Sequence, residues 1–207
     1  MNGVQLTLVT VTSPRPPLTR AAIIAVAREI LATDGLDGVS LRRIGAELGV
    51  TAPALYAHVD DKLDLLRGVA ELEFERLIAR FDAIETRDPV EQIRQQAVAY
   101  VEHAREDPAL FQVMFLFRPD WANQAAAEEL PAASKAFTRG AAAIDAAMLS
   151  GALRTDDPLL VAIAIWAAAH GTASVLLAGM DLGAEYEARV IDTVIDNLIR
   201  GLAVPED

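Results

Sequence analysis

Side chains able to bond a phosphate or a base edge gather in one segment, SLRRIGAELGVTAPALYAHVDDK, which begins at Ser40. Ser40 is a good N-cap for a first short helix, and Gly49 supplies the left-handed residue that ends it. Thr51 then caps a second short helix, with Pro53 in its first turn, where a missing N–H costs nothing. The pattern predicts a helix-turn-helix, a unit that reads DNA. The outward side of its second helix presents Thr51, Ala52, Ala54, Tyr56 and His58.

Helical signals continue along the chain, so we predict an all-α fold. Thr19 can cap a helix that runs to Thr33 and stops at Gly35, and this helix completes a three-helix head with the helix-turn-helix. A long helix from about Asp61 to Phe81 then links the head to a larger helical body. We interpret the first 18 residues, MNGVQLTLVTVTSPRPPL, as a mostly disordered, flexible tail, in which QLTLVTVT is too short and isolated to form a sheet.

Several helices of the body are predicted to begin with the same pair of residues, an acid at the N-cap followed by proline at the first helical position. It occurs three times, at Asp88, Asp107 and Asp157. The last two helices, about Pro158 to Ala178 and Ala184 to Leu202, carry apolar faces that predict a homodimer held by a four-helix bundle across a two-fold axis. The residues on those faces are Ala162, Ile165, Ala168, Ala169, Thr172, Val175, Leu176, Val190, Ile191, Val194, Ile195, Leu198 and Leu202.

The composition is that of a soluble globular chain of 207 residues, with 53% hydrophobic residues and no cysteine. The absence of cysteine excludes thiol catalysis, cysteine-based zinc sites and disulfides, which is consistent with a cytoplasmic protein. The tail lacks a basic stretch and an Ala-x-Ala cleavage site, so we expect no secretory signal. The most apolar run, Leu159 to Met180, contains Ala, Gly, His and Thr, which favours a packed interface helix over a membrane span.

The net charge of −12 is unevenly divided along the chain. Residues 1–59 carry five arginines against four acids, a balance of +1, whereas residues 60–207 carry 13 basic and 26 acidic side chains. Phosphates would repel the body but not the head, which orients the molecule on DNA. Because few cations are available to displace counterions, we expect a modest affinity for DNA.

The DG turn followed by SLRRIGAELGVTAPALYAHVDDKLDLL resembles the amino-terminal DNA-binding domain of the tetracycline-repressor (TetR) family, over roughly Thr19 to Leu66. A shorter stretch, AIWAAAHGTASVL, preceded by DPALFQVMFLF, is similar to the WHG type of regulatory domain in one branch of that family. The resemblance implies a homodimeric transcriptional repressor that leaves a pseudo-palindromic double-stranded DNA operator when a small-molecule effector binds. It divides the chain into the tail 1–18, a DNA-binding domain 19–65, and a ligand-binding and dimerisation domain 66–207.

In such a head the second helix of the motif, from Thr51 to His58, lies in the major groove. Thr51 can bond a base or a phosphate, and the methyl groups of Ala52 and Ala54 can meet a thymine methyl. His58 can bond a base edge or a phosphate. Alanine at 52, 54 and 57 departs from the tetracycline-repressor pattern, so the resemblance does not carry the operator sequence with it.

By the family pattern Tyr56 and Lys62 hold the phosphate backbone, and Arg42 reaches a guanine or a phosphate. Each has a structural alternative. Tyr56 and His58 could pack between helices, Arg42 and Arg43 could form a solvated face, and Lys62 could serve only the start of its helix. The candidate DNA-binding residues are Ser40, Arg42, Arg43, Thr51, Ala52, Pro53, Ala54, Tyr56, His58 and Lys62.

The same resemblance places the effector in the carboxy-terminal half. Its large apolar side chains supply the pool from which a pocket could be lined, although most of them would be plain core. Methionine and bulky aromatics suit an adaptable cavity for a small, largely apolar effector. His170 has the alternative of bonding a neighbouring helix and setting the packing around Gly171. The candidate ligand-binding residues are Tyr100, Met114, Phe115, Phe117, Trp121, Met148, Trp166 and His170.

Two other classes of protein stay open. An enzyme could use Glu102, His103, Glu106 and Asp107, which fall within one helical turn or so, but these residues also suit a solvated helix end. Because the sequence has no nucleophile elbow, phosphate loop or complete ligand set, we expect no catalysis, no metal and no cofactor. The second class is a ligand-binding or protein-interaction module of the same fold with weak or no specific DNA binding, which the acidic charge leaves open.

Overall fold

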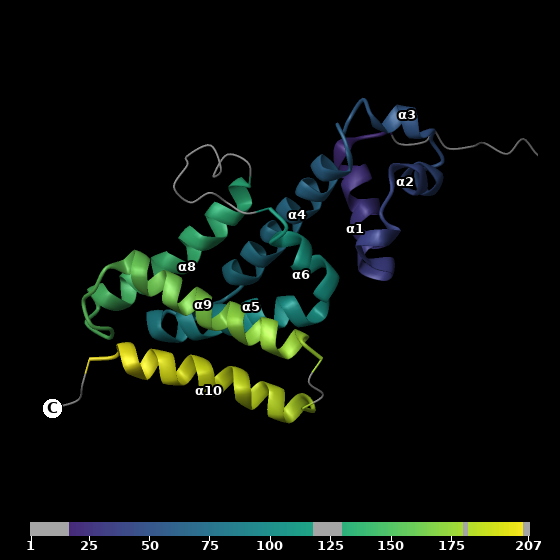
Figure 1. Ribbon diagram of the computed structural model, residues 1–207. Coiled ribbons are helices and arrows are strands. Elements are labelled where there is room, and N and C mark those ends of the chain that lie inside the picture. The colour runs from purple at the N-terminus through teal and green to yellow at the C-terminus, as the bar shows by residue number, and fades with distance from the viewer. Residues whose placement is uncertain (1–16, 118–129, 180–181, 205–207) are drawn as a thin grey trace, which may run out of the picture.

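The computed structural model describes residues 17–117, 130–179 and 182–204, and every regular element within them is a helix (Figure 1). Among these residues the one β-type pairing is an isolated bridge between Leu153 and Ala203. The all-α prediction is confirmed. The predicted tail falls outside the described residues up to residue 16. The helices are α1 (Arg20–Gly38), α2 (Leu41–Leu48), α3 (Ala52–Leu55), α4 (Lys62–Asp82), α5 (Pro89–Glu106), α6 (Pro108–Met114), α8 (Pro131–Leu149), α9 (Pro158–Leu177) and α10 (Ala184–Leu202).

The first two helices of the head begin and turn at the predicted residues. The Thr19 hydroxyl oxygen accepts from the Ala22 amide at 3.2 Å at the start of α1. Gly35 has φ 68° and ψ −170°, a conformation that favours glycine, so the predicted stop is a kink after which helical turns continue to Gly38. At α2, Ser40 Oγ accepts from the Arg43 amide at 3.3 Å.

The turn of the helix-turn-helix depends on two glycines. Gly49 ends α2 in the left-handed conformation with φ 58°. A β-carbon at Gly45 would lie 2.9 Å from the Val50 carbonyl oxygen, so the missing side chain lets the chain fold back closely on α2. The two glycines therefore set the path from α2 to α3.

The second helix of the motif is shorter than the sequence predicts. α3 covers only Ala52–Leu55, and Thr51 makes no side-chain cap bond, so the expectation of a capped helix from Thr51 to His58 is wrong. The amides of His58 and Val59 both bond the Leu55 carbonyl, which turns the chain toward α4. Leu55 and Val59 are fully buried and anchor this turn on the core.

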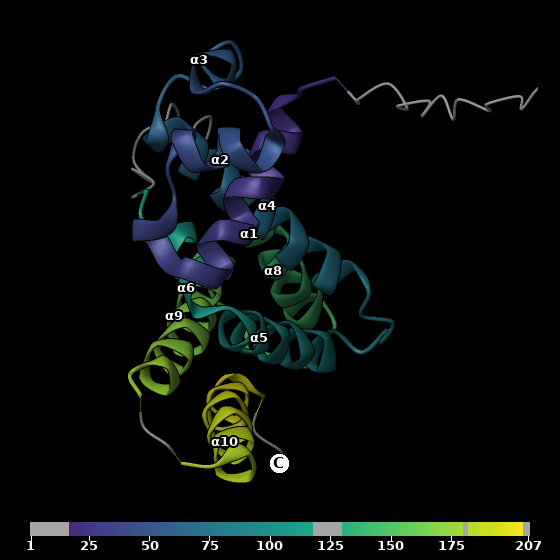
Figure 2. The same ribbon diagram turned by 90° about the vertical axis from the view of Figure 1, so that its right-hand side faces the viewer.

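α4 joins the head to the body in a single helix of 21 residues, close to its predicted bounds. Asp61 caps it by accepting from the Asp64 amide at 2.8 Å. α4 packs on α1 in the head and on α5, α6 and α8 in the body, and the predicted domain boundary after residue 65 falls in its first turns. In both views the head lies at one end of the molecule and α10 at the other (Figure 1 and Figure 2).

The body is arranged around α5, which contacts α4, α6, α8, α9 and α10. The three predicted Asp–Pro starts are confirmed, because each aspartate accepts from an amide two or three residues further on. The distances are 2.9 Å at Asp88, 3.1 Å at Asp107 and 2.9 Å at Asp157. These caps fix where α5, α6 and α9 begin around the core.

The inward faces of α9 and α10 are the ones that the sequence assigned to a dimer. Most of those residues, such as Ala162, Ile165 and Ile195, are buried within the protomer, because α9 packs on α5 and α8 while α10 covers α5 and α9. The other side of α9 is exposed and also apolar, with Leu160 60% and Ile163 43% exposed. By length and hydropathy α9 could cross a membrane, and 39% of its apolar window is buried inside the protein. Because both sides of α9 are apolar, helical periodicity in the sequence does not show which side faces the core.

Candidate DNA-reading surface and ligand cavity

The residues predicted to meet DNA lie at the outer end of the head, on α2, α3 and the turns that flank α3. Ser40, Arg42, Thr51, Pro53 and Ala54 are exposed, and Ala52 and His58 are half-buried. Tyr56 has 57% of its surface exposed, so its ring does not pack between helices of this chain. Most of these groups are therefore open to solvent at this end of the head.

Two of the predicted basic residues have partners within the head. The Arg43 guanidinium pairs with the Asp34 carboxylate near the end of α1. Lys62 Nζ donates to the Leu36 carbonyl oxygen at 3.0 Å while the side chain stays exposed. Both cations therefore fasten the kinked end of α1 to the motif. Lys62 keeps two further N–H donors in its ammonium group.

An ion pair that the sequence did not reveal positions the turn that follows α3. Arg20 on α1 binds Asp64 on α4 through two bonds of 2.7 Å, and its Nη1 also donates to the His58 carbonyl at 2.9 Å. The hydrogen bond from Arg20 is the largest cause that lowers the pKa of Asp64 and raises the pKa of Arg20. One guanidinium therefore joins α1, the turn after α3 and the first turn of α4.

A second charged cluster is buried where the head meets the body. Glu73 on α4 is 2% exposed, and its Oε1 accepts from Arg28 Nε of α1 at 2.5 Å. Its Oε2 lies 3.6 Å from Arg76 Nε and 3.6 Å from His103 Nε2 of α5. Burial is the main cause that lowers the pKa of His103 to about 4, and Arg80, Arg76 and Arg28 lower it further while Glu106 opposes them. His103 is therefore neutral near pH 7, and the cluster ties α1, α4 and α5 together.

The acid/base groups considered for catalysis do not form a site. Glu102 bonds Arg105 at 2.8 Å, Glu106 pairs with Arg80, and Asp107 caps α6. His103 is buried, with 5% of its surface exposed, and its Nε2 lies 3.6 Å from the Glu73 carboxylate. Within the described ranges, no group of three His, Asp or Glu side chains is placed to hold a metal ion. These four residues serve helix ends and helix packing.

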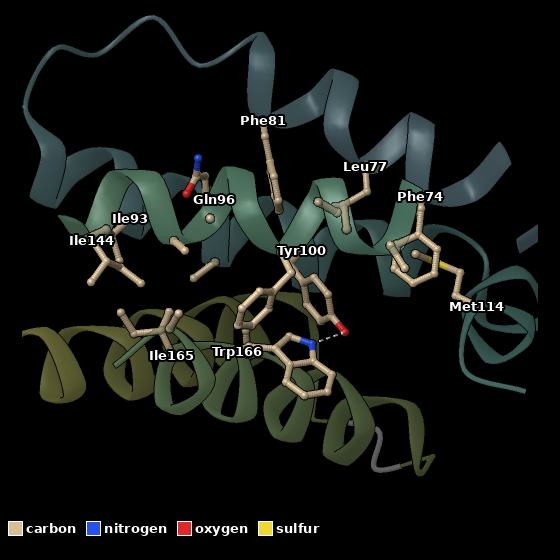
Figure 3. A pocket seen from close by; sticks show the side chains of 18 of the residues that line it. Phe74, Leu77, Phe81, Ile93, Gln96, Tyr100, Met114, Ile144, Ile165 and Trp166 are labelled. Carbon is tan, nitrogen blue, oxygen red and sulfur yellow. Dashed lines mark hydrogen bonds between the residues drawn. The ribbon is translucent and has the colours of Figure 1, made fainter. Parts of the chain in front are cut away.

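A cavity of about 140 Å³ lies in the body between α4, α5, α6, α8 and α9 (Figure 3). Phe74, Leu77 and Phe81 form its α4 wall, and small residues such as Ala136 and Gly140 on α8 leave room opposite. The described side chains that line it carry no charge. The cavity can therefore hold a small apolar molecule next to the helix that supports the head.

Half of the predicted ligand-binding residues line this cavity. Tyr100, Met114, Phe115 and Trp166 belong to its wall, while Phe117 lies under the Arg67 guanidinium at 5.4 Å. Met148 is buried in the core, and Trp121 lies outside the described residues. His170 is not a lining residue but bonds the Tyr100 hydroxyl, which is one. The lining residues that sequence reasoning missed include Phe74, Leu77, Phe81, Ile93, Gln96, Phe137, Gly140 and Ile144.

The polar groups at the aromatic end of the cavity bond one another. Trp166 Nε1, which can only donate, is 3.2 Å from the Tyr100 hydroxyl, and that hydroxyl is 2.8 Å from His170 Nδ1 (Figure 3 shows the first contact). Burial lowers the pKa of His170, which favours a neutral ring. Burial also raises the pKa of Tyr100, so the hydroxyl stays protonated. This chain of bonds links α5 to α9.

A helix-turn-helix head carried on a helical body with an apolar cavity defines the class of ligand-responsive DNA-binding regulators. Two sequence models place the chain within this class. The one described as "Bacterial regulatory proteins, tetR family" matches residues 23–69, and the one described as "Tetracyclin repressor-like, C-terminal domain" matches residues 93–202. The chain belongs to the TetR family of transcriptional regulators, as its head and its body had each suggested.

Relatives and solved structures agree with this assignment. An uncharacterised HTH-type transcriptional regulator of Mycobacterium tuberculosis is 29% identical over 182 residues, which cover 86% of this chain and 79% of that protein. An uncharacterised HTH-type regulator of Bacillus subtilis is 33% identical over 108 residues, and the match spans 50% of this chain and 55% of that protein.

Among solved structures, a protein of unknown function from a Rhodococcus species has a TM-score of 0.79 at 28% identity, covering 93% of this chain and all of that one. The complex of RolR with resorcinol has a TM-score of 0.66 at 21% identity, covering 89% of this chain and 87% of that one. At 21% identity, the similarity to RolR shows that the two proteins share a fold.

Proposed function

We propose that this chain is a homodimeric cytoplasmic repressor that leaves a pseudo-palindromic operator when a small, largely apolar effector enters the cavity. The observation that carries the proposal is that one helix, α4, serves both sites. Phe74, Leu77 and Phe81 of α4 line the cavity, and Asp64 in its first turn binds Arg20 and the turn after α3. A molecule that displaces α4 from the cavity side would therefore move the reading surface.

Release from the operator requires only a modest coupling between the two sites. A coupling free energy of about 1 to 3 kcal/mol between effector and operator gives roughly 5- to 150-fold release. In a dimer this coupling acts through the distance between two heads, because half-sites lie about one helical turn or a multiple of it apart. A small tilt of α4 in each protomer changes that distance.

The dimer surface is assigned to the outward side of α9 together with the neighbouring side of α10. The exposed residues Leu160, Ile163, Ala167, Gly171 and Val175 recur every three or four residues and form one apolar face. A β-carbon at Gly171 would meet nothing within 4 Å, so the centre of this face is flat and open. Such a face suits close packing against its own copy across a two-fold axis.

On DNA, the exposed end of α3 enters the major groove. Thr51 and the methyl groups of Ala52 and Ala54 meet base edges, with Pro53 beside them, while Tyr56 and Lys62 hold phosphates. Arg42 reaches a base or a phosphate from α2, and the His58 side chain a base edge or a phosphate. Ser40 and Arg43 work mainly by holding the motif in shape. A head with so few cations neutralises few phosphates, so its affinity is modest and falls shallowly with salt.

The effector is small because the cavity is small. RolR is recorded in complex with resorcinol, a single-ring molecule, and its fold is similar to this one. That likeness supports an effector of similar size and leaves its identity to experiment.

The test is selection of bound sequences from a random duplex pool at low salt, followed by titration of the selected duplex with the protein. An enriched pseudo-palindrome bound in the nanomolar range supports a specific regulator. Absence of any enriched sequence, from protein that is folded and dimeric, refutes the operator. It would favour instead a ligand-binding or protein-interaction module of the same fold.

A further inference from the structure

We propose that the effector is a compact, uncharged molecule of about one ring, whose hydrogen-bond acceptor is held by the side-chain amide of Gln96. The inference rests on the proposed function, in which the cavity is the effector site. It adds the chemical class of the effector and the residue that selects it. Three properties of the cavity carry it: its volume, the absence of charge on its described walls, and the hydrogen-bonding state of each polar group.

The volume sets the size. The cavity measures about 140 Å³. An engineered apolar cavity of about 150 Å³ lined by leucine, isoleucine and phenylalanine stays dry and binds benzene. The present cavity therefore accepts one ring with a short substituent, unless its walls move apart.

The walls exclude charge. The described lining residues contain no Lys, Arg, His, Asp or Glu. Glu73, which precedes the lining residue Phe74 on α4, is held by Arg28 of the head at 2.5 Å. A carboxylate or an ammonium group brought into this cavity would lose its hydration without gaining a partner, which opposes binding strongly.

One polar group in the wall has an unused donor. Gln96 on α5 is 5% exposed, and its Nε2 has no hydrogen-bond partner among the described residues. Its neighbour Gln95 by contrast bonds Glu91 at 2.8 Å. A buried amide donor without a partner costs free energy, which a ligand acceptor can recover.

The other polar groups cannot take this role as readily. Trp166 donates to the Tyr100 hydroxyl, and the same hydroxyl is also hydrogen-bonded to His170 Nδ1. Figure 3 shows Gln96 between Ile93 and Phe81, apart from the contact between Tyr100 and Trp166. The ligand therefore meets aromatic rings at one end and the amide of Gln96 at the other, where a carbonyl or ether oxygen can accept from the unpartnered Nε2.

The experiment uses three probes of nearly equal size on the full-length protein without DNA: acetophenone, ethylbenzene and benzoate. Binding is measured by titration calorimetry. We expect acetophenone to bind about 5- to 10-fold more tightly than ethylbenzene, the value of one neutral hydrogen bond. Benzoate is expected to bind more weakly than both. Equal or tighter binding of benzoate, or no binding of any probe, overturns the proposal.

Variants assign the contact to its residue. Gln96→Leu should bring acetophenone down to the affinity of ethylbenzene and leave ethylbenzene within about twofold, since an apolar side chain of similar size remains. Gln112→Leu, at an exposed position of α6, is the matched control and should preserve the preference. A preference that survives Gln96→Leu refutes the role of Gln96.

A third variant locates the binding site independently. Gly140 lines the cavity, and a β-carbon there would meet nothing within 4 Å. Gly140→Leu should fill the space and abolish binding of acetophenone and ethylbenzene, with no fall in the melting temperature, because leucine is a better helix former than glycine. Unchanged affinity in a folded Gly140→Leu protein places the probes elsewhere and overturns the proposal.

Operator release separates this inference from the proposed function. If the probes bind in the predicted order but never weaken operator binding, the cavity chemistry stands and the effector role fails. If a charged compound releases the operator and Gly140→Leu abolishes that release, the effector role stands and the chemical class proposed here is wrong.

Discussion

Glu73 and Phe74 are consecutive residues of α4, yet Glu73 binds Arg28 of the head while Phe74 forms part of the cavity wall. The two contacts share one helical turn, so a displacement of α4 at the cavity wall would reach its bond with α1 over a very short path. Glu73 is also the only ionic tie between α1 and the middle of α4 among the described contacts. Its removal tests how firmly the head is held.

We expect Glu73→Gln to lower the free energy of unfolding by roughly 3 kcal/mol, because it leaves Arg28 partly buried without its main partner. The residual Arg28–Glu29 pair at 2.9 Å keeps the loss at the low end of the usual range. The matched control is Glu106→Gln, whose pair with Arg80 is exposed and should be worth less than about 1 kcal/mol. Urea denaturation measures the free energy of unfolding of both variants. Equal losses would show that the buried Glu73 cluster contributes no more to stability than an exposed ion pair.

The buried His103 predicts a fall in stability in mild acid. Its pKa is about 4 in the folded protein and near 6.5 when exposed, so the unfolded chain binds the proton first as the pH falls. Stability from this residue is present above pH 6.5 and is lost between pH 6.5 and about 4, with about 2 kcal/mol lost between pH 7 and pH 5. His170, whose pKa burial also lowers, adds to the same trend.

His103→Leu isolates this contribution, because leucine does not titrate and suits a buried helical position. Denaturation midpoints of the variant should change less between pH 7 and pH 5 than those of the natural protein. The groups that face His103, namely Arg28, Glu73, Arg76, Arg80 and Glu106, remain in both proteins. Identical pH profiles would mean that His103 keeps access to water and titrates normally.

Lys62 offers a test of the DNA surface, because the chain has a second lysine, Lys135, exposed on α8. Lys62→Ala should weaken binding to all duplexes alike and reduce the salt slope by about one, the signature of one lost phosphate contact. Lys135→Ala should leave both quantities unchanged. An unaltered slope in Lys62→Ala would limit Lys62 to its bond with the Leu36 carbonyl, seen here at 3.0 Å.

The parts of this fold that the sequence predicts are those fixed by local chemistry. Ser40 and Gly49 bound α2, and Asp88 and Asp157 begin α5 and α9, because caps depend on residues only a few positions apart. The sequence predicts too long an α3, because no sequence signal marks the turn in which the Leu55 carbonyl accepts from two amides.

The residues missed at the cavity lack such a local signal. Gln96 occupies the buried stripe of α5 as a neutral polar residue, and nothing in the spacing sets it apart from a surface glutamine. The Arg28–Glu73 pair spans 45 positions and links two helices, so charge patterning along either helix does not indicate it. Small residues such as Gly140 become informative only when the opposite wall is known.

Ile163 tests the dimer surface, because it belongs to the apolar face of α9, is 43% exposed and does not line the cavity. Ile163→Glu places a charge where two copies would exclude water, so we expect the dimer to dissociate in the micromolar range while each protomer stays folded. Leu36→Glu, at a 41% exposed apolar position in the head, should leave the dimer intact. Sedimentation velocity across a concentration series distinguishes the two, and operator affinity should fall with dimer dissociation because a single head contacts one half-site. A dimer that survives Ile163→Glu would exclude this face of α9 as the interface.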